Sequence, residues 1–465
     1  MKTMRFLSFL LSVVLLLPLL SSCAEAPQSY VAPEGEAWFM GFASEEIPLP
    51  ETDDPLYIAG YRQGKEITGV LDLQRANAVW MDTGDAGVLL IGIDCVGLGS
   101  DTVNKIREEL SDFCRQTNCV SVNVYATHTH AGVDTLGLWG PIAVDGKNDA
   151  FMENLIHAAV SAAKGAYADR SQGKLLLGTT VPEDLLYDSR RPQEYDSTLY
   201  QLRFVPDHAD QNGIRLLSYA AHAESLRGDN TLLSRDFPGA ISDGIKAATG
   251  DDTLFLPGAI GGLIMTRELV DEPFDATENL RLTGEALTKA VLSIDSETEL
   301  SPSLSIASEK VEIPLDNTLF LCYRFLGILG NPAVDGEGET GYSLVSELGV
   351  LALGNVTLAL IPGEIFPELV SGNGLGAEDP EPLSVIARRH GIENLLIVSL
   401  CNDELGYIVP PSDYLINPDA PYLDGIEDAT GENHYEETNS TGIRTAALLA
   451  EAFEEILSLI TEPRG

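Results

Sequence analysis

The chain has 465 residues, 44% of them hydrophobic, which is enough to bury one large core or two. Its 71 acidic and 28 basic residues give a formal charge of −43. Such a charge repels phosphate backbones and anionic bilayers, which argues against nucleic-acid binding and against an electrostatic hold on membranes.

The N-terminus has the pattern of a bacterial export signal. Two basic residues precede an apolar stretch at 6–20, which is shorter than the about 20 residues that a transmembrane helix needs. The small residues before Cys23 resemble a lipobox, whose cysteine receives a lipid. The alternative is an ordinary signal peptide that happens to contain this cysteine. We therefore expect an exported cell-envelope lipoprotein, membrane-anchored at Cys23, with a signal peptide at 1–22, a tether at 23–40 and one domain at 41–465.

The other cysteines leave the redox state open. Cys114 and Cys119 are close enough in sequence to form a disulfide outside the cytosol, although an odd number of cysteines leaves at least one thiol free. Cys95 and Cys401 lie in apolar runs, which is typical of small buried hydrophobic residues. The chain has no Cys-x-x-Cys pair, so a thiolate zinc site is not indicated.

Predicted strands and helices alternate along the chain. Residues 41–50 look turn-rich, whereas 87–96 is apolar nearly throughout, as in a strand that is covered on both faces. A helix beginning at Ser100 or Asp101 leads to the alternating run 119–125, so these segments predict a right-handed β-α-β unit. Further strands are expected at 76–81, 174–180, 199–204, 214–221, 252–256, 304–314, 355–361 and 394–400, and helices at 150–168, 238–249, 277–294 and about 441–460.

This alternation predicts the α/β class: mixed, largely buried sheets covered by helices, in a single large domain without internal repeats. Residues 316–342 are the least regular segment, and 336–340 and 416–440 are the expected long surface loops. In such sheets ligands bind at the carboxyl ends of the strands, where Asp94 and His128 both lie.

The most informative stretch is His128-Thr129-His130, at the end of the run 119–125. In a strand, residues two apart face the same side, so both imidazoles would point one way, as metal ligands must. Two ligands do not complete a site, and solvated loop histidines are the alternative. Later predicted strands also end in polar residues, namely His222, Glu364 and the loop 402–407, which is the arrangement of an open-sheet active site.

These stretches resemble the catalytic domain of the neutral (non-lysosomal) ceramidase family. Residues 41–50, Gly60-Tyr61 and 91–94 resemble the opening of that domain, and 127–132 resembles its His-Thr-His-Ser-Gly motif. Further along the chain, residues 189–192 resemble its Asn-Arg-Ser-Pro loop. Residues 221–222 resemble the stretch around its second histidine, and 233–236 resemble the Ser-Gly-Asp stretch that follows. Residues 362–364 resemble its Pro-Gly-Glu, and 402–408, with Tyr414 and Tyr435-Glu436, resemble its Asn-Asp/Tyr-Val/Tyr-Glu-Gly block.

The resemblance implies one Zn²⁺ ion, with the site residues that follow. Its ligands would be His128, His222, Glu364 and Tyr407; His130, Arg190 and Tyr435 would line the reacting centre. The implied reaction is hydrolysis of an N-acyl amide, in a sphingolipid or related lipid, by zinc-activated water. His130 is the first choice for the acid that protonates the leaving amine, and His130, Arg190 or Tyr435 would stabilise the oxyanion.

Each residue also has a plainer interpretation. His222 would fit a buried, hydrogen-bonded histidine, Glu364 a solvated turn carboxylate, and Arg190 a surface ion pair. Tyrosine is outside the usual set of zinc ligands, so Tyr407 rests on the resemblance alone.

The sequence departs from the family at three places. The loop that should contain a catalytically important serine corresponds to 258–263, and no serine lies between Ser242 and Ser293. Ala131 replaces the serine after the histidine pair, and the family's C-terminal immunoglobulin-like domain has no counterpart. Three hypotheses follow: an exported zinc amidohydrolase acting on lipid amides or related esters, a non-catalytic lipoprotein that binds metal or lipid, and a zinc hydrolase for a peptide or carbohydrate amide.

Overall fold

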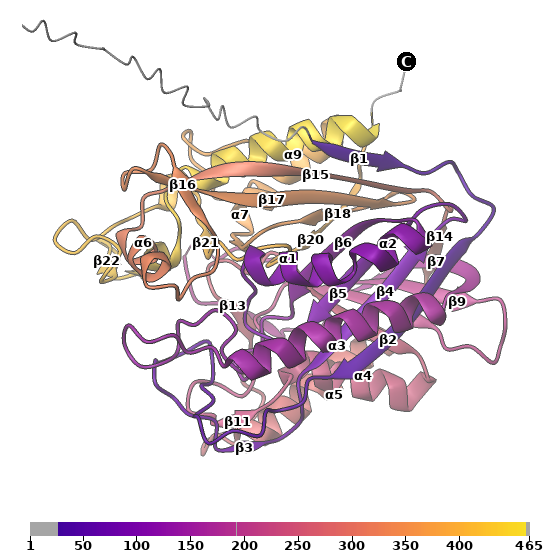
Figure 1. Ribbon diagram of the computed structural model, residues 1–465, viewed down its shortest axis with the longest axis horizontal. Helices are drawn as coiled ribbons and strands as arrows, with labels where there is room; N and C mark the ends of the chain where they lie inside the picture. Colours follow the sequence, from indigo (N-terminus) through magenta and orange to yellow (C-terminus); the bar gives the residue numbers. More distant parts are fainter. Residues whose placement is uncertain (1–26, 192, 462–465) are drawn as a thin grey trace, which may run out of the picture.

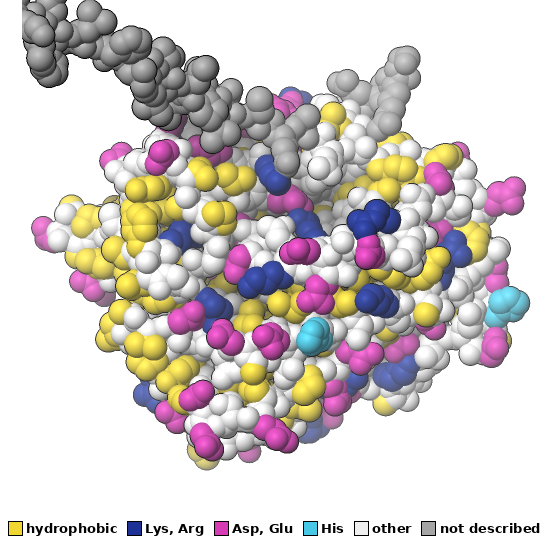
Figure 2. All heavy atoms as spheres, viewed as in Figure 1, with side chains coloured by type: hydrophobic (Ala, Val, Ile, Leu, Met, Phe, Trp, Pro, Cys, Tyr) yellow, Lys and Arg dark blue, Asp and Glu magenta, His cyan; other side chains and the backbone are white. Residues whose placement is uncertain are grey.

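The computed structural model describes residues 27–191 and 193–461 (Figure 1). The predicted signal peptide and the predicted lipidation site, Cys23, lie outside these residues and stay predictions. None of the helices in the described part is long and apolar enough to cross a membrane. Asp and Glu side chains are spread over the face shown in Figure 2, as expected of a chain with a charge of −43.

Two sheets pack face to face and are covered by helices on their outer faces, which confirms the predicted α/β class (Figure 1). The larger sheet has the order β12-β10-β9-β7-β2-β4-β5-β6, with β14 beside β7. Its strands are β2 (Trp38–Glu46), β4 (Arg75–Asp82), β5 (Gly87–Ile93), β6 (Cys119–Ala126), β7 (Ser171–Thr180), β9 (Leu199–Pro206), β10 (Ile214–Tyr219), β12 (Asp252–Pro257) and β14 (Glu297–Leu300).

The smaller sheet has the order β1-β15-β17-β18-β20, with β16 beside β17. Its strands are β1 (Gln28–Val31), β15 (Leu304–Leu315), β16 (Ala333–Asp335), β17 (Tyr342–Leu353), β18 (Val356–Leu360) and β20 (Asn394–Val398). Four short pairs complete the strands: β3 (Gly69–Val70) with β11 (Leu232–Leu233), β8 (Leu186–Asp188) with β13 (Ile264–Thr266), β19 (Glu364–Ile365) with β21 (Tyr407–Ile408), and β22 (Ile426–Glu427) with β23 (Asn433–His434).

The helices form the two outer layers. The larger sheet is covered by α1 (Ser100–Glu109), α2 (Ser111–Thr117), α3 (Asp149–Ala168), α4 (Asp236–Thr249) and α5 (Ala276–Leu292). The smaller sheet is covered by α6 (Thr318–Phe325), α7 (Glu368–Ser371), α8 (Leu383–Arg389) and α9 (Thr445–Thr461). Because both faces of each sheet are covered, central strands such as β5 are buried at every residue, as their apolar sequence predicts.

The structure corrects several sequence-based expectations. The turn-rich interpretation of 41–50 is wrong, because β2 runs through Glu46 in the middle of the larger sheet. Gly41 belongs to this strand because a Cβ there would lie 2.2 Å from the carbonyl oxygen of Ala166 in α3, so the glycine permits close packing. Part of the predicted tether is also ordered sheet, since Gln28–Val31 pairs antiparallel with β15.

Other differences concern the irregular regions. The segment 316–342, expected to be the least regular, contains α6 and β16, and the twelve-residue strand β17 begins at its end. The single helix predicted after Ser100 is two helices, α1 and α2. The predicted β-α-β unit is confirmed, because β5 and β6 pair in parallel. Cys114 and Cys119 are free thiols, and Cys95 and Cys401 are buried as predicted.

The two sheets are joined where β20 ends beside β6. The backbone N–H of Asn402 donates to the carbonyl of Val124 at 2.7 Å, and the Asn402 side-chain oxygen accepts from the Val124 N–H at 3.0 Å. The parallel pairs β5–β6, β10–β12 and β18–β20 therefore direct their carboxyl ends to one region of the molecule.

Asp94, directly after β5, fixes the start of this region. Its carboxylate accepts hydrogen bonds from the Arg75 backbone N–H at 3.0 Å and from the Thr127 hydroxyl at 3.3 Å. It thereby connects β4 to the residue that precedes His128. Burial raises the pKa of Asp94 to about 7.

We expect the Asp94→Asn variant to remove a pH dependence of stability. A carboxyl whose pKa is raised by folding stabilises the protein fully below its unfolded pKa, and this contribution is lost as the pH rises through the folded value of about 7. Between pH 5 and pH 8 the native protein should lose on the order of 3 kcal/mol that the variant keeps. Denaturant unfolding of both proteins at both pH values measures this. The expectation is contradicted if the free energy of unfolding of the native protein differs from that of the variant by the same amount at pH 5 and at pH 8.

Candidate metal centre

His128 enters the centre from the turn after β6. Its backbone has a φ of +64°, a left-handed conformation that is uncommon for residues other than glycine and is concentrated at functional sites. Its Nδ1 lies 2.6 Å from the carbonyl oxygen of Val96. Because a carbonyl can only accept, Nδ1 holds the proton, and the Nε2 lone pair is free to bind a metal.

His222 is oriented in the same way from the end of β10. Its Nδ1 donates to the carbonyl of Ile264 at 2.9 Å, which directs its Nε2 lone pair into the centre. The side chain is fully buried and both ring nitrogens have hydrogen-bond partners, so the interpretation as a buried, hydrogen-bonded histidine is correct; Nε2 is the nitrogen that faces the centre.

Glu364, the first residue of β19, joins the two histidines. Its Oε2 lies 2.9 Å from Nε2 of His222 and 3.4 Å from Nε2 of His128. Burial alone would raise the pKa of Glu364, but His128 and His222 lower it below its ordinary value. Glu364 is therefore the buried carboxylate of the centre and not a solvated turn residue.

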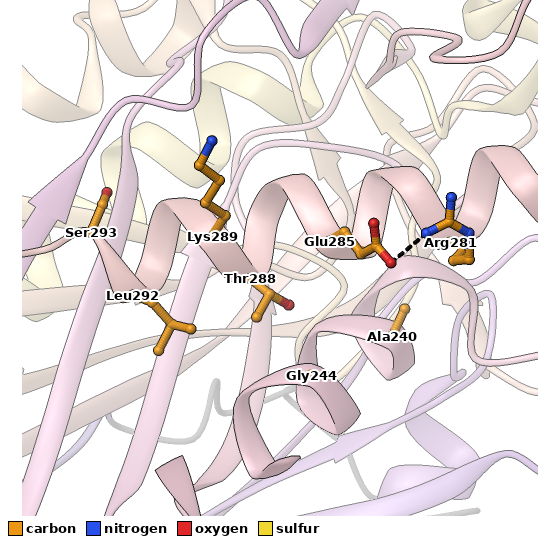
Figure 3. A pocket seen from close by; sticks show the side chains of 9 residues that line it. Ala240, Gly244, Arg281, Glu285, Thr288, Lys289, Leu292 and Ser293 are labelled. Carbon is orange, nitrogen blue, oxygen red and sulfur yellow. Dashed lines mark hydrogen bonds and ion pairs between the residues drawn. The ribbon is translucent and has the colours of Figure 1, made fainter. Parts of the chain in front are cut away.

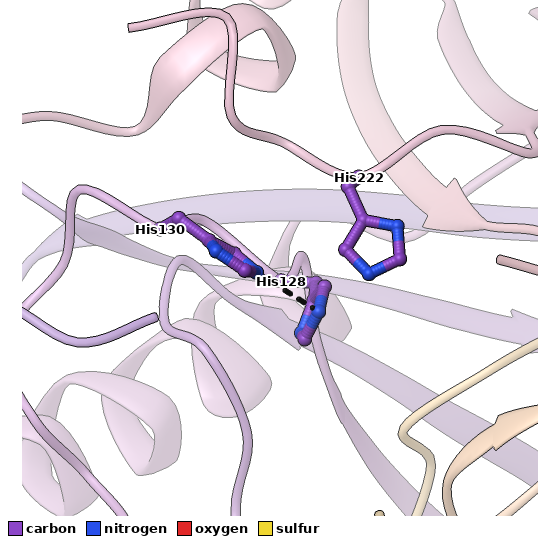
Figure 4. Close-up of side chains that lie close together, drawn as sticks. All are labelled: His128, His130 and His222. Carbon is purple, nitrogen blue, oxygen red and sulfur yellow. Dashed lines mark hydrogen bonds between the residues drawn. The ribbon is translucent and has the colours of Figure 1, made fainter. Parts of the chain in front are cut away.

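His130 completes a group of three imidazoles (Figure 4). Its Nε2 lies 3.1 Å from Nε2 of His128. Gly60 gives the ring its space, since a Cβ there would lie 2.5 Å from it, and the Gly60 φ of +103° suits glycine. Burial, together with His128 and His222, lowers the pKa of His130 well below its ordinary value, so this imidazole is neutral.

The histidine pair converges for a different reason from the predicted one. β6 ends at Ala126, so His128 and His130 lie beyond the strand, and the two-residue repeat of a strand does not apply to them. The left-handed turn at His128 brings the rings together, with their centroids 4.7 Å apart.

The residues present fit a metal ion. His128, His130 and His222 offer nitrogen atoms within 4.8 Å of one another, and all three are buried. The Nε2 lone pair of His222 faces a carboxylate oxygen at 2.9 Å, which is repulsive unless a proton or a cation lies between them. Imidazole nitrogen and carboxylate oxygen are a donor set that suits zinc.

Tyr407 lies beside Glu364 because β19 and β21 pair in parallel, with these two residues in register. Its hydroxyl oxygen is 3.4 Å from that of Tyr435. Burial, and then the carboxylate of Glu364, raise the pKa of Tyr407 well above its ordinary value. Both tyrosines line the cavity at the histidines, and the assignment of Tyr407 as a metal ligand stays a prediction.

Arg190 does not line the cavity as the resemblance implies. Its guanidinium group is buried and donates to Asp413 at 2.9 Å, Glu436 at 2.8 Å and Glu437 at 2.9 Å. All its nitrogen atoms are engaged, so none is directed at a substrate. Arg190 instead fixes the segment that contains Tyr435, and the interpretation as a surface ion pair is wrong as well.

The cavity at the histidines has a volume of about 390 Å³. Besides polar groups, its lining contains the apolar side chains that form its apolar wall, namely Leu136, Leu138, Trp139, Phe320 and Leu329. Glu404, from the predicted polar loop 402–407, also lines it, and so does Glu224, which was not predicted from the sequence. Glu224 follows His222 by two residues, the same spacing as in His128-Thr129-His130, and this spacing could have revealed it.

The loop 258–263 approaches the centre without a hydroxyl group. The N–H of Gly261 donates to the carbonyl of Ile365 in β19 at 2.9 Å, and Leu263 lines the cavity. The place predicted for the serine loop therefore contributes an apolar side chain.

A second hollow, of about 580 Å³, lies between α4 and α5 (Figure 3). Its charged lining residues include Arg281 and Glu285, which form an ion pair with each other on α5. It contains no cluster of metal-binding groups among the described residues, and we assign no chemistry to it.

Comparisons with known proteins agree with this geometry at the level of the fold. No family sequence model and no curated protein matches the chain. Among solved structures, the neutral ceramidase from Pseudomonas aeruginosa superposes with a TM-score of 0.72 at 15% identity, covering 91% of this chain and 74% of that one. A ceramidase complexed with C2 gives a TM-score of 0.69 at 15% identity, covering 92% and 77%. The chain therefore has a neutral ceramidase-like fold, as the sequence motifs predict.

The metal centre predicts the zinc content of histidine variants. The native protein should contain about one zinc per chain, and His128→Ala or His222→Ala should lose it, because each removes a ligand whose Nδ1 is already fixed by a carbonyl. His130→Ala should keep its zinc if His130 serves the substrate. Elemental analysis measures all three, with the exposed His157→Ala as the control.

Two results would contradict this assignment. A native protein that stays free of zinc when the metal is supplied would exclude the site. Loss of zinc from His130→Ala would make His130 a ligand and not a substrate-facing group.

The Arg190 network predicts a large effect on stability. Arg190→Met leaves Glu436 and Glu437 buried without their cation, which should lower the free energy of unfolding by about 3–5 kcal/mol. Arg281→Met, which breaks solvent-exposed pairs on α5, should lower it far less. Urea unfolding compares the two variants, and equal effects would mean that the Arg190 network is not structural.

Proposed function

We propose that this protein is a zinc-dependent amidohydrolase that cleaves an N-acyl amide of a lipid. The observation that supports this most is the convergence of His128, His222 and Glu364 beside a cavity that His128, Glu364 and several apolar side chains line. The solved structures with the same fold are named ceramidases. Because a ceramidase acts on a fatty-acid amide, we propose a substrate of this class.

The side chains of the centre are prepared for a metal. Carbonyl oxygens fix the tautomers of His128 and His222, and Glu364 is held as a carboxylate by the imidazoles beside it. Zinc, when bound, lowers the pKa of a water molecule to about 7 and so supplies a nucleophile at neutral pH.

Two other residues are suited to act on the substrate. Burial raises the pKa of Tyr435, so its hydroxyl keeps its proton and can donate to the carbonyl oxygen of the amide. His130 is neutral and lies against the metal-binding imidazoles, so its free ring nitrogen can accept a proton from the attacking water and pass that proton to the leaving nitrogen. Arg190 acts through Tyr435, whose segment it holds in place.

The apolar wall of the cavity suits an alkyl chain. Trp139, Phe320 and Leu329 would cover such a chain, and burial of each methylene contributes about 0.8 kcal/mol. Because the loop 258–263, where the family's serine is expected, contains no serine, the proposed reaction uses no serine nucleophile. An exported location, with a lipid anchor at Cys23 that holds the enzyme at its substrate, is part of the same proposal.

The absence of a hydroxyl at 258–263 also supports a second candidate function. A lipoprotein without catalytic activity could keep the same centre and cavity to bind a metal or a lipid. The two candidates make opposite predictions for turnover.

We expect the zinc-loaded protein to hydrolyse a fluorescent long-chain N-acyl amide. His130→Ala should lower kcat by roughly 10²–10⁴-fold, and Tyr435→Phe by roughly 10²–10³-fold, because each removes a donor to the reacting amide. Chromatographic measurement of the released fatty acid follows the reaction. Binding of the substrate without its cleavage would favour the second candidate, and unchanged turnover in both variants would place the active site elsewhere.

A further inference from the structure

Glu224 is a buried carboxylate at the centre for which the proposed mechanism has no use. It follows the end of β10, two residues after His222, and its neighbour Ala223 accepts a hydrogen bond from the N–H of His130 at 3.0 Å. Glu224 is 3% exposed, and it lines the cavity together with Tyr61 and His130.

The carboxylate of Glu224 is only half satisfied. Its Oε2 accepts a hydrogen bond from the Tyr61 hydroxyl at 2.5 Å, whereas Oε1 is buried and has no hydrogen-bond partner. Nδ1 of His130 lies 3.6 Å from Oε2, which is beyond hydrogen-bond distance. A carboxylate has about four acceptor positions, and a buried oxygen without a donor is costly, so Oε1 is suited to a ligand.

Two cations of this region, Lys65 and Arg227, have other partners for their charged groups. Lys65 donates to the carbonyl of Gly228 at 2.8 Å, and Arg227 is directed to Glu268 and to backbone carbonyls. Among the described residues no Lys or Arg side chain forms an ion pair with Glu224. The ligand that fits must therefore bring a hydrogen-bond donor, and a positively charged donor fits best.

We propose that Glu224 recognises the nitrogen side of the substrate: Oε1 accepts a hydrogen bond from the N–H of the scissile amide and pairs with the ammonium group of the released amine. This inference rests on the proposed function and narrows the substrate class to N-alkyl amides. An ester has an oxygen with no hydrogen at the same position, so it leaves Oε1 unsatisfied. A fatty acid anion would be repelled by Glu224.

Binding of the amine tests this without turnover. The zinc-loaded native protein should bind octylamine in a calorimetric titration at pH 7.5, where the amine is protonated, more tightly than octanol. Glu224→Gln should weaken octylamine binding at least about tenfold, because a hydrogen bond to a charged group is replaced by one to a neutral group. Glu268→Gln, a change at the exposed partner of Arg227, is the matched control and should leave the affinity unchanged.

The discrimination between amides and esters provides a second readout. Glu224→Gln should lower kcat/KM for an N-acyl amide at least about tenfold and change that for the matched O-acyl ester by less than about twofold. Zinc content and melting temperature establish that the variant is folded and loaded.

Each outcome decides the role of Glu224 separately from the proposed function. The role of Glu224 in amine recognition is overturned if the native protein and Glu224→Gln bind octylamine with equal affinity, or if the native protein does not bind it. Glu224-dependent binding of octylamine by a protein that cleaves no amide would support the recognition of the amine and would refute the hydrolase. If the protein cleaves amides but Glu224→Gln does not change octylamine binding, the hydrolase is supported and the recognition of the amine by Glu224 is refuted.

Discussion

The structure depends on one buried carboxylate that two histidines share across the boundary between the sheets. Glu364 follows β18 of the smaller sheet, whereas His222 and His128 follow β10 and β6 of the larger one. Removing a carboxylate from water costs several kcal/mol, and the opposing charge must come from groups that the fold places there. The contact at 2.9 Å between Glu364 and His222 therefore constrains both sheets at once, and a cation at this point would hold them together.

The other polar connections of the molecule are arranged around this boundary. Asn402 joins β20 to β6, Asp94 connects β4 to the residue before His128, and Arg190 holds the segment with Tyr435. Away from the boundary the layers are packed through apolar side chains. A site at such a boundary can combine residues from distant parts of the chain with an apolar wall, which is what a lipid amide requires.

Apolar patterning predicts the fold and the meeting of His128, His222 and Glu364 well, because both depend on where strands end. The buried run that forms β5 and the polar residues after β6, β10 and β18 are visible in the sequence, and they lead to His128, His222 and Glu364. The remainder depends on contacts that sequence spacing does not show. Gly41 looks like a turn residue but permits contact with α3, and the partners of Arg190 lie more than 220 residues further along the chain. The spacing after His222 points to Glu224, but its contacts with His130 and Tyr61 exist only in the folded chain.

The central claim is that the strand ends of both sheets meet at one metal ion. Anomalous diffraction at the zinc absorption edge, from crystals of the zinc-loaded protein, tests it most directly. We expect one strong peak about 2.0–2.2 Å from Nε2 of His128, Nε2 of His222 and a carboxylate oxygen of Glu364. A peak elsewhere, or no peak at these three side chains, would contradict it.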